Sequence, residues 1–401
     1  MSAPFSILSN RQYAKYFSAL LLSRIGDGMQ FIAMSWLLYR LTNSIAASGW
    51  LLVLTSLPGM LFSPWIGVLV DRHDARRICI GVDLVCTVVL MIVTSCAYHD
   101  TLAPWLIYCA EFLLATCAAI YQPAAAVMLQ RMLGQENLLA ANSMSSIGTQ
   151  TGMLIGTVAA GFLIAQLGGA AAFFCNALSF LLSALFTFWI SLKHFAPKEA
   201  NANPASAWQE FKEGMRYLLA HRNLLGLALL QVIIFVPLFI CNTLLPGFVN
   251  RQIHAGASGF GLIEGAFALG AIICGLLLKT ILQRFGLPRA RLMGLFGIAI
   301  AMWVFGSATQ LPQAMLGYFL FGFLIPGLRI STDTALQTSV DQHYLGRILS
   351  TIYMLISWLG LIAYASIGYL GDAVALAAIY YVLAGVMLVS TVLTLVWQGR
   401  R

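Results

Sequence analysis

The chain has 401 residues, of which 60% are hydrophobic and only 9% are charged. Soluble domains carry about 25% charged residues, so this composition excludes an ordinary soluble protein and predicts several membrane crossings. The formal net charge of +8 is compatible with nucleic-acid binding. The positions of the cations, described below, argue against that function.

Apolar runs long enough to cross a bilayer recur along the whole sequence. A hydrocarbon core of roughly 30 Å requires about 20 apolar residues of helix. The sequence therefore predicts an all-α membrane protein with twelve membrane-spanning helices. They cover residues 16–41, 46–70, 78–98, 104–124, 138–164, 170–192, 224–248, 258–281, 290–308, 312–333, 346–369 and 374–397.

A polar segment separates the first six spans from the last six. It predicts an N-terminal half over residues 1–195, a cytoplasmic linker over 196–222 and a C-terminal half over 223–401. Within the linker, WQEFKEGMRYLLAHR (208–222) carries apolar residues at helical spacing and charged residues on the other faces. We expect an amphipathic helix on the cytoplasmic membrane surface, with a solvated, locally packed helix as the alternative.

The lysines and arginines are distributed unequally between the two sides of this topology. Nearly all of the 22 fall on the side that holds both termini, whereas Arg40 and Arg251 fall on the other and Arg24 and Arg329 lie inside spans. The positive-inside rule then places both termini in the cytoplasm. Because the basic charge is explained by topology, we expect a lipid bilayer and no nucleic acid as partner.

Motifs that would indicate an enzyme or a metal site do not occur in the sequence. It has no H-E-x-x-H, no phosphate-cradling glycine loop and no setting for a serine or cysteine nucleophile. The six histidines are not paired at metal-ligand spacing, and the eight cysteines are scattered without a C-x-x-C pair. We therefore expect no enzyme, metal or cofactor, and interpret the cysteines as small buried hydrophobic residues.

A charged segment between the second and third spans gives the most specific signal. GVLVDRHDARR (67–77) follows the pattern G-x-L-x-D-R-x-x-x-R-R. It resembles the signature loop of the major facilitator superfamily of secondary transporters. The resemblance implies a cytoplasmic gate formed by Gly67, Asp71, Arg72, Arg76 and Arg77.

The same resemblance implies partners for that gate. The aspartate would face the positive end of the helix that starts near Gly346, and Arg76 or Arg77 would complete an ion-pair network. Asp341 is a candidate partner for the arginines. The alternative is that the loop arginines only set the topology.

Four further segments are similar to one branch of this superfamily, the drug exporters related to macrolide-efflux and enterobactin-export proteins. They are SRIGDG (23–28), YQPAAAVMLQRMLGQENLLAANSM (121–144), WQEFKEGMRYLL (208–219) and TALQTSVDQHYLGRILS (334–350). The resemblance covers nearly the whole chain. It implies two pseudo-symmetric six-helix halves that work by alternating access, in a functional monomer of the bacterial inner membrane.

Glycines gather in the fifth span. They are Gly148, Gly152, Gly156 and Gly161. The first three share one helical face, which lets two helix backbones approach closely, and helix packing alone is one interpretation. The stretch also resembles an exporter motif ending in G-P-x-x-G-G, from which this sequence departs at Thr157 and Ala160.

Ionisable residues inside spans cost roughly 2.5–3.5 kcal/mol each on insertion scales, which makes them functional candidates. Those deep enough to consider are Arg24, Asp27, Glu111, Glu264 and Arg329. One hypothesis is that Asp27, with Glu111 or Glu264, binds a proton and exchanges it for substrate. The alternative is a permanent ion pair between Arg24 and Asp27, which share a helical face.

Two other acids, Asp83 and Asp333, lie near cytoplasmic ends of spans and are expected to be structural. Asp333 is four residues after Arg329, a spacing at which the two side chains can form an ion pair.

The resemblance also places the first, fourth, seventh and tenth spans around a central substrate cavity. Candidate cavity residues are Arg24, Gln30, Phe31 and Arg329. We predict proton-coupled export of amphipathic small molecules. Two cations in the cavity would suit an anionic metabolite or siderophore, the alternative substrate, unless Asp27 and Asp333 neutralise them.

Overall fold

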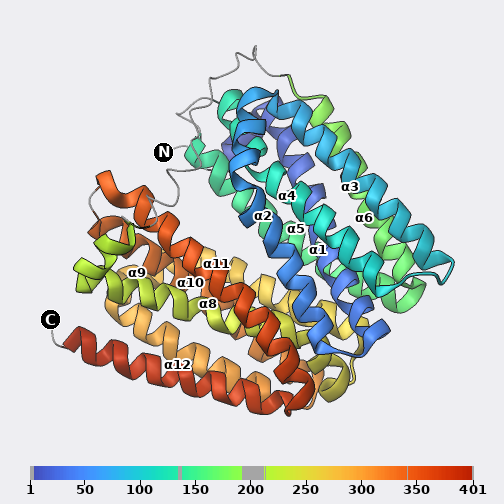
Figure 1. Ribbon diagram of the computed structural model, residues 1–401. Helices are drawn as coiled ribbons and strands as arrows, with labels where there is room; N and C mark the ends of the chain where they lie inside the picture. Colours follow the sequence, from blue (N-terminus) through green and yellow to red (C-terminus); the bar gives the residue numbers. More distant parts are fainter. Residues whose placement is uncertain (1–3, 134–137, 192–211, 213, 341, 400–401) are drawn as a thin grey trace. The chain divides into compact units, whose positions relative to one another are not determined.

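A computed structural model describes residues 4–133, 138–191, 212, 214–340 and 342–399, and these contain helices but no strand (Figure 1). The first part of the chain forms η1 (Pro4–Ser9), α1 (Arg11–Thr42), α2 (Ile45–Arg72), α3 (Ala75–Tyr98), α4 (Pro104–Leu133), α5 (Leu138–Leu167) and α6 (Gly169–Phe188). The second part forms α8 (Arg222–Phe248), η2 (Val249–Ile253), α9 (Gly256–Gly306), α10 (Leu311–Ser339), α11 (Gln342–Ala373) and α12 (Leu376–Gly399).

Each predicted span overlaps a helix of the described residues, and the predicted all-α membrane fold is confirmed. The sixth predicted span extends past Phe188, where α6 ends. The eighth and ninth predicted spans both fall in α9, which breaks at Gly286, where φ is 73° and ψ is 159°. Glycine tolerates a positive φ because it has no Cβ. Ten helices in the described ranges are long and apolar enough to cross a membrane, with α9 counted once. The polar α1 is not among the ten.

The predicted amphipathic helix lies only partly within the described residues. Residues 208–211 and 213 lie outside them, and residues 214–220 are helical. Leu218 is buried and Arg216 is exposed, as a two-faced helix requires, but Leu219 is exposed as well. The position of this helix on a membrane surface stays a prediction.

The chain divides into two compact units. The first comprises Met1–Asn43, Leu54–Ala202 and Gly256–Gly265. The second comprises Ser44–Val53, Asn203–Ala255 and Ala266–Arg401. The start of α2 therefore belongs to the second unit and the start of α9 to the first.

In the first unit, α1 packs against α5 and α6, and α3 runs beside α6 (Figure 1). Glycines allow the close approach of α1 to its neighbours. A Cβ on Gly28 would lie 2.8 Å from the carbonyl oxygen of Met153 on α5, and one on Gly26 would lie 2.5 Å from Asn176 on α6. The segment around Asp27 is thus held between two helices.

The four glycines of α5 lie against other helices. A Cβ at Gly148, Gly152, Gly156 or Gly161 would meet, respectively, Phe17, Arg24, Ile25 or Ala257. The first three of these partners belong to α1, so the glycine face supports the packing of α1 on α5. Thr157, which stands where the exporter motif has proline, is buried, and its hydroxyl donates to the Leu154 carbonyl at 3.2 Å.

In the second unit, α8 packs against α10 and α11. The end of α8 is fixed by an aromatic cluster with α9 and α12. The ring centroids of Phe248 and Phe305 are 4.6 Å apart, and those of Phe305 and Tyr380 are 5.0 Å apart. All three side chains are fully buried.

An acid that the sequence analysis did not single out joins three segments of the second unit. Asp372, near the end of α11, accepts hydrogen bonds from the Ser44 hydroxyl at 2.6 Å and from the backbone N–H groups of Ile45 and Ala46 at 3.0 and 3.1 Å. Its Oδ1 also pairs with Nη2 of Arg251 at 2.9 Å. The carboxylate therefore caps the positive end of α2 from a different helix.

Candidate functional site

A buried carboxyl group on α4 connects three helices of the first unit. Glu111 is 6% exposed. Its Oε2 accepts a hydrogen bond from Nε2 of Gln30 on α1 at 3.0 Å, and its Oε1 accepts one from the Thr55 hydroxyl on α2 at 3.0 Å. In the described part of the chain no ion pair involves Glu111. Both carboxyl oxygens therefore have neutral donors.

The neighbouring acid on α1 has a different partner. Nη1 of Arg24 and Oδ2 of Asp27 form an ion pair at 2.8 Å, and the two side chains are 17% and 29% exposed. This geometry fits a permanent ion pair between Arg24 and Asp27, which is the alternative to proton binding by Asp27. Nε of the same arginine is buried without a hydrogen-bond partner.

The two kinds of partner have different consequences for proton binding. A guanidinium stays positive at all physiological pH values and favours an ionised carboxylate beside it. Amide and hydroxyl groups hydrogen-bond a carboxyl group in either protonation state. Glu111 can thus gain a proton without leaving a cation unpaired, whereas protonation of Asp27 would remove the counter-ion of Arg24.

The remaining first-unit candidates are Phe31 on α1 and Glu264 on α9. The Phe31 ring packs against Phe260 of α9, with centroids 6.2 Å apart. Glu264 is a half-buried residue of the same helix segment. The structure thus brings Gln30 and Glu111 into contact and directs Phe31 toward α9, and the predicted roles of all four stay predictions.

The second unit contains a similar amide–carboxylate contact. Nε2 of Gln231 on α8 donates to Oδ1 of Asp333 on α10 at 2.7 Å. The ion pair expected between Asp333 and Arg329 does not occur in the described ranges, where the Arg329 side chain is exposed. The carboxylate of Asp333 accepts a hydrogen bond from the amide of Gln231 instead.

Asp83 of α3 is fully buried against α6. The Ser183 hydroxyl donates to its Oδ2 at 2.8 Å, and its Oδ1 has no hydrogen-bond partner. The contact joins α3 to α6, and the expected structural role of Asp83 stays a prediction.

The predicted cytoplasmic gate is described only in part. The surroundings of Gly67, Asp71 and Gly346 lie outside what the structure describes, as does Asp341. The predicted contact of the gate aspartate with that helix therefore stays a prediction. Arg72 and Arg77 are exposed and line a pocket of about 500 Å³ at the loop.

Arg76 reaches the end of α6 rather than a carboxylate. Its guanidinium donates to the Phe188 carbonyl and lies 5.3 Å from the centre of the Phe188 ring. Lys15 donates to the next carbonyl, that of Trp189, at 2.7 Å. The last carbonyls of a helix have no partner within it, so these two cations satisfy the negative end of α6.

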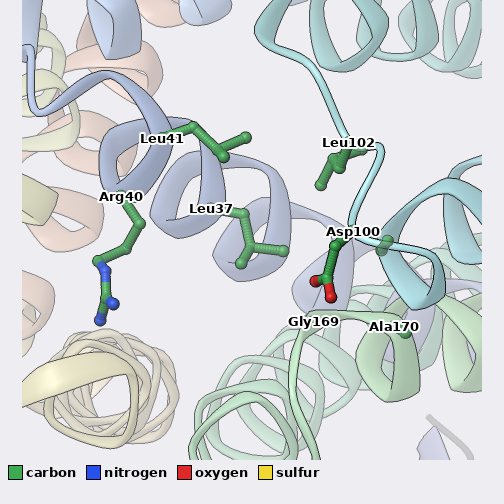
Figure 2. A pocket seen from close by; sticks show the side chains of 8 residues that line it. Leu37, Arg40, Leu41, Asp100, Leu102, Gly169 and Ala170 are labelled. Carbon is green, nitrogen blue, oxygen red and sulfur yellow. The ribbon is translucent and has the colours of Figure 1, made fainter.

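A separate pocket of about 290 Å³ lies where the end of α1, the loop after α3 and the start of α6 meet (Figure 2). Figure 2 shows Arg40 and Asp100 on opposite sides of Leu37, without pointing toward one another. Neither Glu111 nor Asp27 lines this pocket, so it is not the candidate site.

Comparison with known families assigns the chain to a protein family. A family model described as transmembrane secretion effector matches residues 2–399. The chain belongs to this family. It is a branch of the major facilitator superfamily, so the resemblance drawn from the charged loop and the exporter segments is confirmed.

Named relatives of this family member include drug and siderophore transporters. Macrolide efflux protein A of Enterococcus faecalis is 26% identical over 73% of the chain and 91% of the relative. The staphyloferrin A transporter of Staphylococcus aureus is 23% identical over 84% of each chain. The multidrug efflux pump Tap of Mycobacterium bovis is 23% identical over 91% of this chain and 88% of its own.

Solved structures of major facilitator transporters share the fold of this family member. The nucleoside transporter NupG superposes with a TM-score of 0.73 at 12% identity, over 96% of this chain and 98% of its own. The peptide transporter PepTSo gives 0.72 at 13% identity, over 97% and 98%. These likenesses show the fold, and the family model with the named relatives makes the protein a multi-pass membrane transporter.

Three contact residues of this transporter were missed in the sequence analysis. Gln231 is an isolated amide within an apolar run, which is a usable signal because polar side chains in spans bond to other helices. Asp372 follows a predicted span and Thr55 lies inside one. Neither carries a local pattern, since their partners come from distant parts of the chain.

Proposed function

We propose that this transporter exports amphipathic small molecules across the bacterial cytoplasmic membrane in exchange for protons. The observation that carries the proposal is the placement of Glu111, a carboxyl group buried in α4 that is hydrogen-bonded by two neutral groups. An acid inside a membrane protein is costly and marks a pathway or a relay. Neutral donors leave this acid free to change its charge.

The proton step follows from the hydrogen bonds of Glu111. As a carboxylate it accepts from the Gln30 amide and the Thr55 hydroxyl. When it takes up one proton, it becomes a neutral acid whose O–H donates to one of those groups, so one hydrogen bond reverses direction. Because these groups lie on α1 and α2, protonation changes the contacts between three helices. Release of the proton on the other side of the membrane restores the carboxylate and its first set of hydrogen bonds.

The ion pair of Arg24 and Asp27 supports a fixed role for both residues. We infer that Asp27 stays ionised as the counter-ion of Arg24, one turn before Gln30 on α1. This assigns proton coupling to Glu111 in preference to Asp27. Glu264 stays a second candidate, because it is a half-buried acid within a predicted span.

The substrate class and topology rest on the relatives and on charge. A macrolide efflux protein and a multidrug pump among the relatives support amphipathic substrates. The cation distribution supports cytoplasmic termini. Twelve helices in one chain suffice for a complete pathway, so we infer a functional monomer that transports without catalysis, cofactor or nucleic acid.

An anionic substrate is the second candidate. The exposed guanidinium of Arg329 has no ion pair in the described part of the chain, so its charge is available to a ligand. A relative named staphyloferrin A transporter supports this alternative. Arg24, by contrast, is already neutralised by Asp27.

The experiment uses purified protein in liposomes that trap a pH-sensitive dye. Erythromycin, ethidium and ferric citrate are added in turn, and proton movement is recorded. We expect a signal from erythromycin or ethidium that is lost in Glu111→Gln and kept in Asp100→Asn, an exposed loop control. A signal from ferric citrate alone, lost in Arg329→Ala, would establish the alternative. Absence of proton movement with every probe would refute proton coupling.

A further inference from the structure

The second unit repeats the amide–carboxyl arrangement of the first with different residues. In the first unit, Gln30 on α1 donates to Glu111 on α4 at 3.0 Å. In the second unit, Gln231 on α8 donates to Asp333 on α10 at 2.7 Å. Because α9 contains two helices, α8 and α10 are the first and fourth helices of their half, as α1 and α4 are of theirs.

The surroundings of Asp333 contain one cation at a distance and no ion pair in the described ranges. Arg329 lies one turn earlier on α10, and the Tyr353 phenol faces the carboxyl group from α11. The partner from α8 is the amide of Gln231, which does not titrate. In the described ranges no ion pair fixes Asp333, so the carboxyl group is not bound to a permanent cation.

A second observation points to a site that accepts a proton. Gln231 is fully buried, and its Oε1 has no hydrogen-bond partner. A buried acceptor without a donor is costly unless a donor reaches it in another state. If Asp333 is protonated and the amide turns over, the new carboxyl O–H can donate to that oxygen. The same side chain then serves both charge states of Asp333.

We propose that Asp333 is a second proton-binding carboxyl group, positioned by Gln231, so that each half of the transporter carries one such site. The carboxylate takes up one proton to become a neutral acid and later releases the same proton. This inference deepens the proposed function and rests on it for the role in transport. The proton-binding step itself is measurable without any substrate.

The first test is infrared difference spectroscopy of the purified protein during a pH titration. Protonation of a carboxylate produces a carboxylic C=O stretching band. We expect Asp333→Asn to lose one such component and Glu111→Gln to lose a different one, while Asp100→Asn matches the wild type. An Asp333→Asn spectrum that superimposes on the wild type throughout the titration would overturn the proposal.

A second variant tests the positioning role of Gln231. Gln231→Leu removes the amide but keeps a similar volume in the fully buried site. The ionised carboxylate then loses a hydrogen-bond donor, so its affinity for a proton should rise about tenfold. The titration midpoint of the Asp333 band should therefore move to higher pH. The Glu111 band should not move. An unchanged midpoint for Asp333 would show that Gln231 does not position it.

Transport separates failure of this inference from failure of the proposed function. Protons moved per erythromycin should fall by about half in Asp333→Asn if both halves contribute one proton. An unchanged ratio in Asp333→Asn, with transport lost in Glu111→Gln, would remove Asp333 and leave the proposed function intact. A third outcome is that both bands titrate but no probe is transported together with protons. That result would refute the proposed function and would still establish Asp333 and Glu111 as proton-binding sites.

Discussion

At the residue scale, the partner of each acid within a span determines what that acid can do. Asp27 faces the guanidinium of Arg24, whereas Glu111 faces an amide and a hydroxyl. A cation holds a carboxylate in one charge state, and a neutral partner does not. Two acids in the same helical unit thus receive different roles from the side chains beside them.

The ion pair gives a prediction about stability. Asp27→Asn leaves the Arg24 guanidinium without its counter-ion, and removal of one member of a buried pair costs about 3–5 kcal/mol. Partial exposure of both side chains places the expected loss at the lower end of that range. Thermal unfolding in detergent should show that Arg24→Gln combined with Asp27→Asn is less destabilised than Asp27→Asn alone. Additive losses would contradict a direct pairing.

Local spacing made part of this network predictable. Arg24 and Asp27 are three residues apart, so a helix alone brings them together. Gln30 and Thr55 are 81 and 56 residues from Glu111, and only the packing of α1, α2 and α4 shows that they meet it. Local spacing also favoured a pair between Arg329 and Asp333, which are four residues apart. In the structure, the Asp333 carboxylate accepts a hydrogen bond from Gln231, which lies 102 residues away in the sequence.

At the element scale, glycines determine how closely α1 can lie to its neighbours. A Cβ on Gly152 would lie 2.6 Å from the Cβ of Arg24, at the start of the SRIGDG segment. By contrast, a Cβ on Gly81 of α3 would meet nothing within 4 Å. The two glycines form a matched pair for testing close packing against simple helix propensity.

Gly152→Ala should therefore destabilise the transporter, because overpacking costs about 1–3 kcal/mol. Gly81→Ala should be neutral or stabilising by up to about 1 kcal/mol, since alanine favours helix over glycine. Thermal unfolding in detergent measures both. Equal effects of the two substitutions would mean that the α1–α5 contact does not depend on the absence of a side chain at Gly152.

The cap at the start of α2 gives a prediction about local dynamics. Asp372→Ala removes the acceptor of the Ile45 and Ala46 N–H groups, and loss of a cap costs about 0.5–2 kcal/mol. Hydrogen exchange measured by mass spectrometry should quicken in the peptide that contains both groups, by about tenfold. Peptides of α12 serve as the internal control. Unchanged exchange at the start of α2 would exclude a capping role for Asp372.

Helix positions were the most predictable part of the fold. Apolar length predicted a helix at each span of the described residues, because the bilayer requires about 20 apolar residues. The contacts of the loop arginines were not predictable, since Arg76 binds carbonyl groups at the end of α6 that have no sequence pattern. Likewise, the assignment of Ser44–Val53 to the second unit depends on Asp372 and its neighbours, which follow much later in the chain.

At the scale of the whole molecule, family membership and fold agree on a transporter. Side chains, rather than the fold, determine which substrate a member of this branch transports. Relatives with similar coverage are named for macrolides, a siderophore and multiple drugs. The central claim is that Glu111 links substrate movement to protons while the Arg24–Asp27 pair stays fixed.

The measurement that tests this claim most directly compares two kinds of transport in the same liposomes. Exchange of labelled for unlabelled erythromycin needs no net proton movement, whereas accumulation against a gradient needs an imposed pH difference. We predict that Glu111→Gln keeps exchange but loses pH-driven accumulation by at least about tenfold, because the neutral amide mimics one charge state permanently. Full pH-driven accumulation by Glu111→Gln would exclude Glu111 as the proton-coupling residue and assign that role to another residue.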